Sequence, residues 1–238
     1  MGGKLLKFEL IGRIGCFKKY YSNKNVLSYY LPPRTTITGI LASILMLEKD
    51  SYYKIFDPKN INIGVQINNE PKVYVTPLNH IKDDNDRRQV RHQFLLPKND
   101  NISYIVYLYF KSFQYEKELI NKIINKNFGF GVSLGQKQFK GYIDNPELVS
   151  SYKFIKDFKG EISSITSVEN VYKINPIKEN IVIKELMPVN FKEIKKGREP
   201  LEYGEFIYEK TGKSLMGYFK KVLKINDKYI SFFKVGEE

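Results

Sequence analysis

The sequence contains very few of the residues that form disulfides and metal sites. It has one cysteine, Cys16, and two histidines, His80 and His92, among 238 residues. A single cysteine cannot form an internal disulfide, and these three side chains, with the histidines twelve positions apart, do not make a zinc site. We therefore expect no disulfide, no metal and no cofactor. The sparse use of cysteine is typical of a protein in a reducing cytoplasm.

Long hydrophobic runs are also missing. The longest apolar stretch covers residues 37–47, and Thr38, Gly39 and Ser43 interrupt it. A membrane span needs about 20 apolar residues, and charged side chains break residues 1–15, so we expect neither a span nor a signal peptide. Hydrophobic residues still make up 42% of the chain, which is enough for a folded core. The sequence predicts a soluble, cytoplasmic protein without a membrane partner.

Acidic residues are scarce in three segments that carry most of the net charge of +13. Residues 1–34 have seven bases and one acid, residues 87–98 have four bases, and residues 129–142 have two, the last two segments without any acid. Such clusters favour an anionic partner, for example a nucleic acid. Residues 143–238 are nearly neutral, with 17 bases and 15 acids, and are better suited to protein contacts.

The hydrophobic pattern predicts an α+β fold, because apolar residues alternate in some segments and recur at helical spacing in others. The expected strands lie near residues 5–11, 61–67, 72–77, 103–110 and 139–143, and the expected helices near 33–47 and 116–127. This order matches the split βαβ pattern of a ferredoxin-like or RRM-like domain over residues 1–143. Residues 144–238 predict a smaller, mostly β region. Its expected strands lie near 168–174, 181–185, 206–208 and 229–235, with one helix near 214–222.

Aromatic side chains are interleaved with bases in the first charged segment. Lys and Arg can contact phosphates, and Tyr rings offer faces on which unpaired bases stack, at about 1–3 kcal/mol per base. The helix expected after Pro33 adds backbone N–H groups and a positive dipole end, where a phosphate can bind. The candidate RNA-binding residues here are Arg13, Lys18, Lys19, Tyr20, Tyr21, Lys24 and Arg34. The alternative is a loop whose lysines are solvated and whose tyrosines pack on the core.

The second segment follows an acidic turn at Asp83 to Asp86. A basic strand without acids after such a turn indicates an exposed hairpin arm over about residues 79–96. Its candidate RNA contacts are Arg87, Arg88, Arg91 and His92. The alternative is a solvated hairpin held by its own ion pairs.

The third segment is rich in glycine. Gly129, Gly131 and Gly135 precede Lys137. Glycine lets a backbone approach a phosphate closely because it has no side chain, so Lys137 joins the candidates. On its own this segment has little specificity.

A metal-free ribonuclease is the catalytic alternative. Such an enzyme needs a general base, a general acid and a cation beside the phosphate, and His92 or His80 together with Tyr20 can supply the first two. A lone histidine in a basic strand is more often an RNA contact or a surface residue, and no complete catalytic set stands out. We therefore favour RNA binding without catalysis. A third interpretation is a basic assembly module that never contacts RNA.

Several of these residues also resemble a known family. The sequences FELIG (8–12), FKK (17–19), LSYYLPPRT (27–35) and GILA (39–42) closely resemble the N-terminal signature of the CRISPR-associated Cas5 family. Leu134-Gly135 before Phe139 resembles the later Leu-Gly segment of that family. The likeness is specific over residues 5–47, looser to about 143, and closest to the type I-B branch. The family belongs to the RAMP superfamily of RRM-like proteins.

The resemblance implies a subunit of the type I Cascade surveillance complex in antiviral defence, which binds the 5′ handle of CRISPR RNA (crRNA) and caps the backbone of the complex. The implied partners are crRNA, the backbone, large and RNA-processing subunits, and indirectly the target DNA. A projecting β-hairpin thumb presses on the RNA in this family, and residues 79–96 are the best candidate for it. In the type I-C branch the family protein cuts precursor RNA, whereas elsewhere a separate endonuclease does so.

Overall fold

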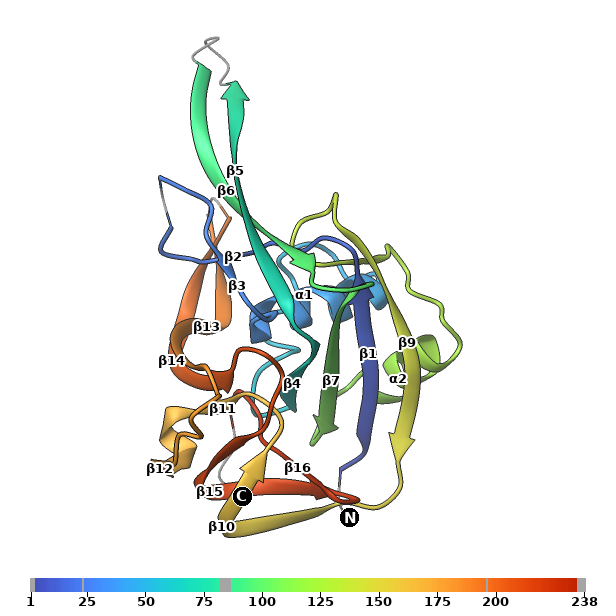
Figure 1. Cartoon of the computed structure of the whole chain (residues 1–238). Helices are drawn as coiled ribbons and strands as arrows, with labels where there is room; N and C mark the ends of the chain where they lie inside the picture. The colour runs from blue at the N-terminus through green and yellow to red at the C-terminus, as the bar shows by residue number, and fades with distance from the viewer. Residues whose placement is uncertain (1–2, 23, 82–86, 196, 235–238) are drawn as a thin grey trace.

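A five-stranded antiparallel sheet forms the centre of the molecule (Figure 1). The computed structural model describes residues 3–22, 24–81, 87–195 and 197–234. The strands lie in the spatial order β4-β7-β1-β9-β8. Their bounds are Ile61–Asn69 for β4, Ile102–Phe110 for β7, Leu5–Gly12 for β1, Lys140–Val149 for β9 and Val132–Ser133 for β8. The strands expected near 5–11, 61–67, 103–110 and 139–143 are therefore confirmed.

Two helices pack against this sheet, α1 (Arg34–Ile44) and α2 (Glu116–Ile124). Alternate residues of a strand point to one face, and Leu6 and Phe8 of β1 join one buried cluster with Ile37 of α1 and Leu119 of α2. Leu5 belongs to a different buried cluster, made with residues of β7 and of the C-terminal region. The central sheet is therefore covered on both faces, by the helices and by C-terminal strands.

The C-terminal region contains two further sheets. In one, the order is β10-β15-β12 and β16 pairs with β15; in the other it is β11-β14-β13. The bounds are β10 Lys153–Ile162, β11 Thr166–Ser167, β12 Val171–Ile174, β13 Val182–Ile194, β14 Gly197–Glu209, β15 Leu215–Ile225 and β16 Lys228–Ile230, with a short 3₁₀ helix at Val168–Asn170. The long β13–β14 hairpin lies on the same side of the molecule as the N-terminal loop after β1 (Figure 1).

A second long hairpin extends away from the body (Figure 1). It consists of β5 (Pro71–Ile81) and β6 (Arg87–Pro97), paired antiparallel over their whole length. The expected acidic turn, residues 83–86, lies outside the described residues. The short strands β2 (Phe17–Lys18) and β3 (Ser28–Tyr29) pair with each other beside the base of this hairpin.

Two expectations for the C-terminal half need correction. The helix expected near 214–222 is wrong, because these residues fall in strand β15. Leu215, Phe219 and Val222 have a near-helical spacing, but all three are buried in a sheet between β10 and β12, and this pairing overrides the local pattern. Strand β9 also continues from residue 140 to 149, across the expected domain boundary at 143 and 144.

Candidate nucleic-acid interface

The three basic segments of the sequence meet at one end of the molecule. The backbone of Gly15 exchanges two hydrogen bonds with Leu95 of β6, at 3.0 and 2.8 Å, and the N–H of Val26 donates to Arg91 at 2.9 Å. On its other side, the N–H of Cys16 donates to the carbonyl of Leu134 at 3.0 Å. The N-terminal loop therefore lies between the basic hairpin strand and the glycine-rich segment, which is the arrangement that a continuous basic track requires.

A glycine allows the closest of these contacts. Gly135 has φ of 90°, and a Cβ atom placed there would come within 2.0 Å of the carbonyl oxygen of Cys16. No other residue fits this position without moving one of the two segments. Lys137 follows two residues later and is exposed.

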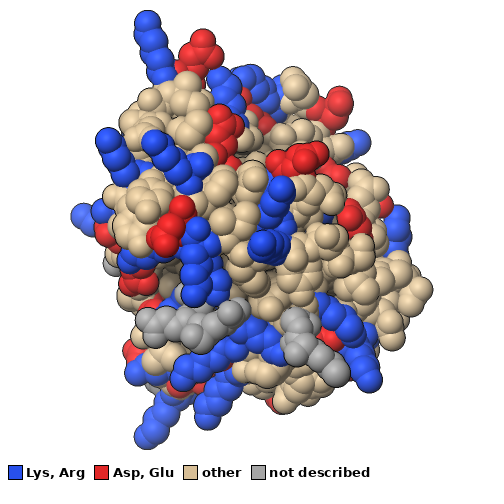
Figure 2. Space-filling model, turned by 90° about the horizontal axis from the view of Figure 1, so that it is seen from below, with Lys and Arg blue, Asp and Glu red and all other residues tan. Residues whose placement is uncertain are grey.

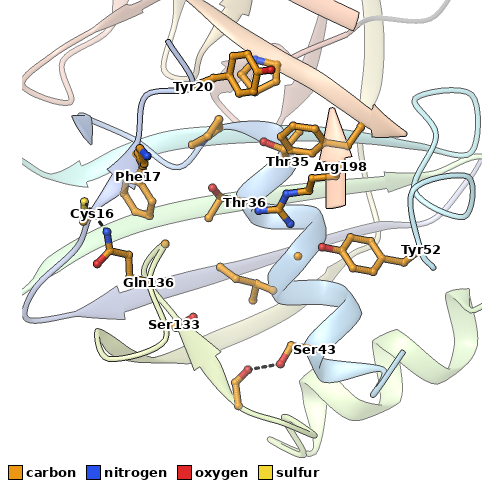
Figure 3. Close-up of a pocket in the computed structure, with 18 residues that line it drawn as sticks. Cys16, Phe17, Tyr20, Thr35, Thr36, Ser43, Tyr52, Ser133, Gln136 and Arg198 are labelled. Carbon is orange, nitrogen blue, oxygen red and sulfur yellow. Dashed lines mark hydrogen bonds between the residues drawn. The ribbon is translucent and has the colours of Figure 1, made fainter. Parts of the chain in front are cut away.

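The N-terminal loop and the glycine-rich segment, together with α1 and the β13–β14 hairpin, line a pocket of about 440 Å³ at the start of α1 (Figure 3). Thr35 and Thr36, the second and third residues of the helix, lie in its wall. The preceding residue, Pro33, makes no side-chain cap. The first N–H groups of a helix have no acceptor within the helix and carry the positive end of its dipole. The N–H of Thr36 already donates to the carbonyl of Pro33 at 2.9 Å. The pocket therefore offers the N–H of Thr35 and the positive end of the helix dipole to an anion of the size of a phosphate.

Two cationic side chains that lie far apart in the sequence line the same pocket. Lys18 is exposed on β2, and Arg198 comes from β14. The guanidinium of Arg198 lies 5.0 Å from the ring centre of Phe191 and 3.8 Å from a carboxylate oxygen of Asp50. Figure 3 shows its side chain reaching toward the first turns of α1. A phosphate in the pocket would therefore face a helix end and two side-chain cations.

Cys16 and Gln136 form the side of the pocket opposite Arg198 (Figure 3). The Nε2 atom of Gln136 lies 3.4 Å from the sulfur of Cys16. Burial raises the pKa of the Cys16 thiol to about 11, although the nearby ammonium of Lys18 acts in the opposite direction. The thiol therefore stays protonated at neutral pH and contributes a neutral wall, not a nucleophile.

Aromatic side chains stand at the rim. Tyr20 and Tyr21 are 47% and 53% exposed, so their faces are open to a partner. The Tyr20 ring packs edge-on against Tyr203 of β14, with 5.7 Å between ring centres. Arg13 and Lys24 are also exposed in this loop. The expected combination of bases and aromatic faces is therefore present at the surface.

Two of the expected phosphate contacts have other partners. The expectation for Arg34 is wrong: its side chain is buried, 1% exposed, and donates to the carbonyls of Val189 at 3.0 Å and Phe56 at 2.6 Å. Lys19 forms a largely buried ion pair with Glu185 and lies 5.3 Å from the centre of the Tyr29 ring. Arg34 joins α1 to β13, and Lys19 joins the loop to the same strand.

The hairpin presents the remaining arginines. Arg87, Arg88 and Arg91 are all exposed along β6. Residues of β6 below them, toward the body, contact the N-terminal loop through the hydrogen bonds described above. The arginines therefore extend the positive surface from the pocket along the hairpin.

The two histidines lie against each other. The Nε2 atoms of His80 and His92 are 2.7 Å apart, and the rings stack with 5.0 Å between their centres. His92 is 6% exposed; its burial, followed by the charges of His80 and Lys18, lowers its pKa. A direct contact between the two Nε2 atoms leaves no room for a phosphate between them. One histidine of the pair can act as an acid and the other as a base, but their Nε2 atoms are directed at each other and not at a substrate.

The sequence did not reveal the contribution of the β13–β14 hairpin. Arg198, Phe191 and Pro188 all line the pocket, although they lie in the nearly neutral C-terminal segment. The only local signal was Arg198 itself, one basic residue among several in an evenly charged stretch. Its position depends on the packing of β13 against α1, which no local pattern encodes.

Within the described residues, no group of three or more His, Cys, Asp and Glu side chains is arranged to hold a metal ion. No helix within them is long and apolar enough to cross a bilayer.

Both a family model and solved structures that are similar to this chain belong to CRISPR-associated proteins. Residues 5–108 match the family model described as CRISPR-associated protein (Cas_Cas5). No curated protein matches the chain by sequence. Among solved structures, a CRISPR protein from Archaeoglobus fulgidus is similar with a TM-score of 0.63 and 14% identity, covering 97% of this chain and 100% of the other.

Two further structures share the fold. A structure described as a Cas protein has a TM-score of 0.51 and 13% identity, and covers 90% of this chain and 95% of the other. A chain of a CRISPR RNA-guided surveillance complex has a TM-score of 0.50 and 10% identity, covering 92% and 91%. At these identities the structures establish a common fold. The family match covers residues 5–108, and the shared fold extends over nearly the whole chain.

Proposed function

We propose that the chain is a non-catalytic subunit of a type I CRISPR effector complex of the Cascade class, and that it holds the 5′ handle of crRNA. The observation that carries the proposal is a pocket at the start of α1 that the N-terminal and glycine-rich basic segments line, with the basic strand β6 hydrogen-bonded to the same N-terminal loop. The match of residues 5–108 to the Cas5 family model, and the similarity to a chain of a CRISPR RNA-guided surveillance complex, support the same role. The implied partners are crRNA, the backbone, large and RNA-processing subunits, and indirectly the target DNA.

The order of elements supports the ferredoxin-like reading of the N-terminal half, which remains part of the proposal. The chain runs β1, α1, β4, β7, α2, β9, and the spatial order β4-β7-β1-β9 places the first strand beside the third and last of these four. This is the arrangement of a split βαβ unit. We take residues 3–149 as this unit and the strands from β10 onward as the C-terminal region.

In the proposed complex a backbone phosphate of the handle occupies the pocket. The N–H of Thr35 donates to one of its oxygens, while Lys18 and Arg198 neutralise its charge. A base leaving the pocket stacks on Tyr20 or Tyr21, whose rings are exposed. Arg13, Lys24 and Lys137 flank this site, and Lys19 and Arg34 act as structural residues.

The β5–β6 hairpin is the proposed thumb. Its exposed arginines follow the pocket along β6, and His92 lies at their inner end beside Lys18. A strand of RNA that leaves the pocket along this edge would meet Arg91 first and then Arg87. The thumb of the proposal therefore covers residues 71–97, longer at its base than the segment 79–96 that the sequence suggests.

Binding of a labelled repeat RNA tests this function. The variant Lys18→Gln/Arg198→Gln removes both pocket cations, and each lost phosphate contact lowers the slope of log K against log salt by about 0.7 for a single strand. We expect weaker binding and a slope less steep by about one contact or more. Lys192→Gln, on the same hairpin as Arg198 but paired with Glu199 at 2.8 Å, is the matched control. Unchanged affinity and slope in the pocket variant would exclude the pocket as the RNA site.

The His80–His92 contact keeps a metal-independent endoribonuclease as the second candidate function. This reading predicts that the purified chain cuts the labelled repeat RNA in EDTA and that His92→Ala abolishes the cut. Tyr20→Phe would then slow cleavage if the phenol takes part in proton transfer. The non-catalytic proposal predicts intact RNA in the same reaction, with binding retained.

A further inference from the structure

The near neutrality of the C-terminal region conceals a separation of charge in space. The strands of the β13–β14 hairpin hold six acids and three bases, and three of the acids pair with bases: Glu205 with Lys184, Glu199 with Lys192, and Glu185 with Lys19. The other sheet, made of β10, β12, β15 and β16, contains eight lysines and two acids in its strands. The lysines are Lys153, Lys156, Lys159, Lys173, Lys220, Lys221, Lys224 and Lys228. This set is called the lysine sheet below.

The lysine sheet lies at the opposite end of the molecule from the pocket (Figure 1). Figure 2 looks at this end and shows Lys and Arg side chains spread over it, several of them beside one another. Within the described residues, none of Lys153, Lys159, Lys220 and Lys224 lies within ion-pair distance of a carboxylate. These charges are therefore not balanced by the fold itself.

The register of the strands places like charges opposite one another. Lys153 of β10 is paired with Lys224 of β15, and Lys156 is paired with Lys221. Like charges at directly opposed positions destabilise an antiparallel pair. The two pairs are three residues apart along β10 and therefore lie on opposite faces of the sheet. Lys159 is paired with Tyr218, on the same face as Lys153 and Lys224, and an anionic polymer lying along this face would neutralise its lysines.

Aromatic rings accompany the lysines. Tyr172 and Tyr218 are 53% and 37% exposed, and their ring centres are 4.6 Å apart. The ammonium of Lys220 lies 5.8 Å from the centre of the Tyr172 ring. Exposed tyrosine faces among lysines offer both stacking and phosphate contacts, as single-stranded nucleic acids require.

The aromatic rings favour a nucleic acid over an acidic protein as the occupant. Every base in the four strands is a lysine, and a lysine ammonium contacts phosphate as a point charge. The exposed rings of Tyr172 and Tyr218 add faces on which unpaired bases can stack, and an acidic polypeptide has no bases to stack there. We propose that the lysine sheet is a second nucleic-acid-binding surface, which takes a single strand with unpaired bases and is separate from the pocket.

Fluorescence anisotropy with a labelled, mixed-sequence single-stranded DNA of about 20 nucleotides tests the proposal. The test variant carries Lys153→Gln, Lys159→Gln, Lys220→Gln and Lys224→Gln. We expect the affinity to fall by about tenfold or more and the slope of log K against log salt to become less steep by about 3, the value for four phosphate contacts. The control is Lys184→Gln/Lys192→Gln, whose lysines are paired with Glu205 and Glu199.

The two surfaces are separated by combining variants. In the Lys18→Gln/Arg198→Gln background, the lysine-sheet changes should lower affinity for the DNA by the same factor as in the wild type, because the sites are far apart and independent. If repeat RNA does not bind at the pocket, the lysine-sheet changes can still lower the affinity for DNA by the same factor. The test of the lysine sheet is therefore independent of the test of the proposed function. Thermal unfolding verifies that the four-lysine variant is folded, and its midpoint should be equal or higher because opposed charges are removed.

Three outcomes would overturn the proposal. The first is an unchanged affinity and salt slope in the four-lysine variant. The second is tighter binding of a duplex of the same length than of the single strand, since a duplex hides the bases that Tyr172 and Tyr218 would stack. The third is a preference for polyglutamate over the single strand, which would assign the surface to an acidic protein.

Discussion

The buried guanidinium of Arg34 donates a hydrogen bond to the carbonyl of Val189, 3.0 Å away, and so ties the first turn of α1 to strand β13. A second nitrogen donates to Phe56 at 2.6 Å and to Ile61 at 3.3 Å. Burial lowers the pKa of Arg34 to about 10, still well above neutral pH. A charged side chain with backbone acceptors therefore fixes the relative position of α1 and β13, both of which line the pocket.

Replacing Arg34 by methionine should destabilise the fold without changing the RNA contact itself. The variant leaves three carbonyls without this donor, and we expect a loss of about 3 kcal/mol in the free energy of unfolding. Urea denaturation measures this loss. Arg13→Met, at an exposed position, is the control and should change stability by less than about 0.5 kcal/mol. If the Arg34→Met protein were as stable as the wild type but had a smaller slope of log K for RNA binding against log salt, Arg34 would be an RNA contact.

The histidine pair should make stability depend on pH. The pKa of His92 is lower in the folded state than its ordinary value of 6.5, chiefly because the ring is buried. Between these two values the unfolded chain binds more protons, so stability rises with pH. The contribution is complete above about pH 6.5 and is lost as the pH falls toward the folded pKa. Urea denaturation at several pH values should show this loss, and His92→Gln should remove it. An equally steep loss in the variant would show that other groups cause it.

The close approach of Gly135 to Cys16 predicts a large effect of one methyl group. Gly135→Ala places a Cβ against the Cys16 carbonyl in a left-handed backbone conformation, and we expect a loss of about 2 kcal/mol or more together with weaker RNA binding. Gly131→Ala is the matched control, because its φ is 99° but no atom lies within 4 Å of the added Cβ. It should show only the backbone cost, about 1 kcal/mol. Equal losses in the two variants would contradict the role of the contact.

The hairpin arginines should contribute to RNA affinity through phosphates. Arg87→Gln/Arg91→Gln is expected to weaken binding of the repeat RNA and to lower its salt slope by about 1.4, the value for two contacts with a single strand. Lys98→Gln, just beyond β6, is the control because Lys98 pairs with Glu70 at 2.7 Å. Ultraviolet crosslinks of bound RNA should include the exposed part of β6. If the slope of log K against log salt did not change, Arg87 and Arg91 would not contact the RNA.

The N-terminal sheet and its helices followed from the sequence because their signals are local. Residues of β1 alternate between two faces, and α1 carries Ile37, Ile40, Leu41 and Ile44 on one buried face after a proline. The basic segments were also visible in the sequence. Their meeting at one end required the pairing of Gly15 with Leu95 and of Cys16 with Leu134, which only the tertiary structure shows.

The errors have a common physical origin. Arg34 looked like a phosphate contact because bases near a helix start commonly serve that role, but its environment is set by β13, far along the chain. Residues 214–222 looked helical because burial against two sheets produced a spacing close to that of a helix. Arg198 carried no pattern of its own and gains its position from the β13–β14 hairpin. Each case depends on contacts between residues distant in sequence.

The placement of the pocket has a consequence for synthesis on the ribosome. Strand β1, made first, lies between β7 and β9, and the pocket wall is completed only by Phe191 and Arg198. A chain that grows from its N-terminus must therefore wait for most of its length to emerge before the sheet closes and the anion site exists. The nascent protein exposes its basic loop well before it has a formed pocket, so the proposed RNA capture requires that the β13–β14 hairpin has already been synthesised.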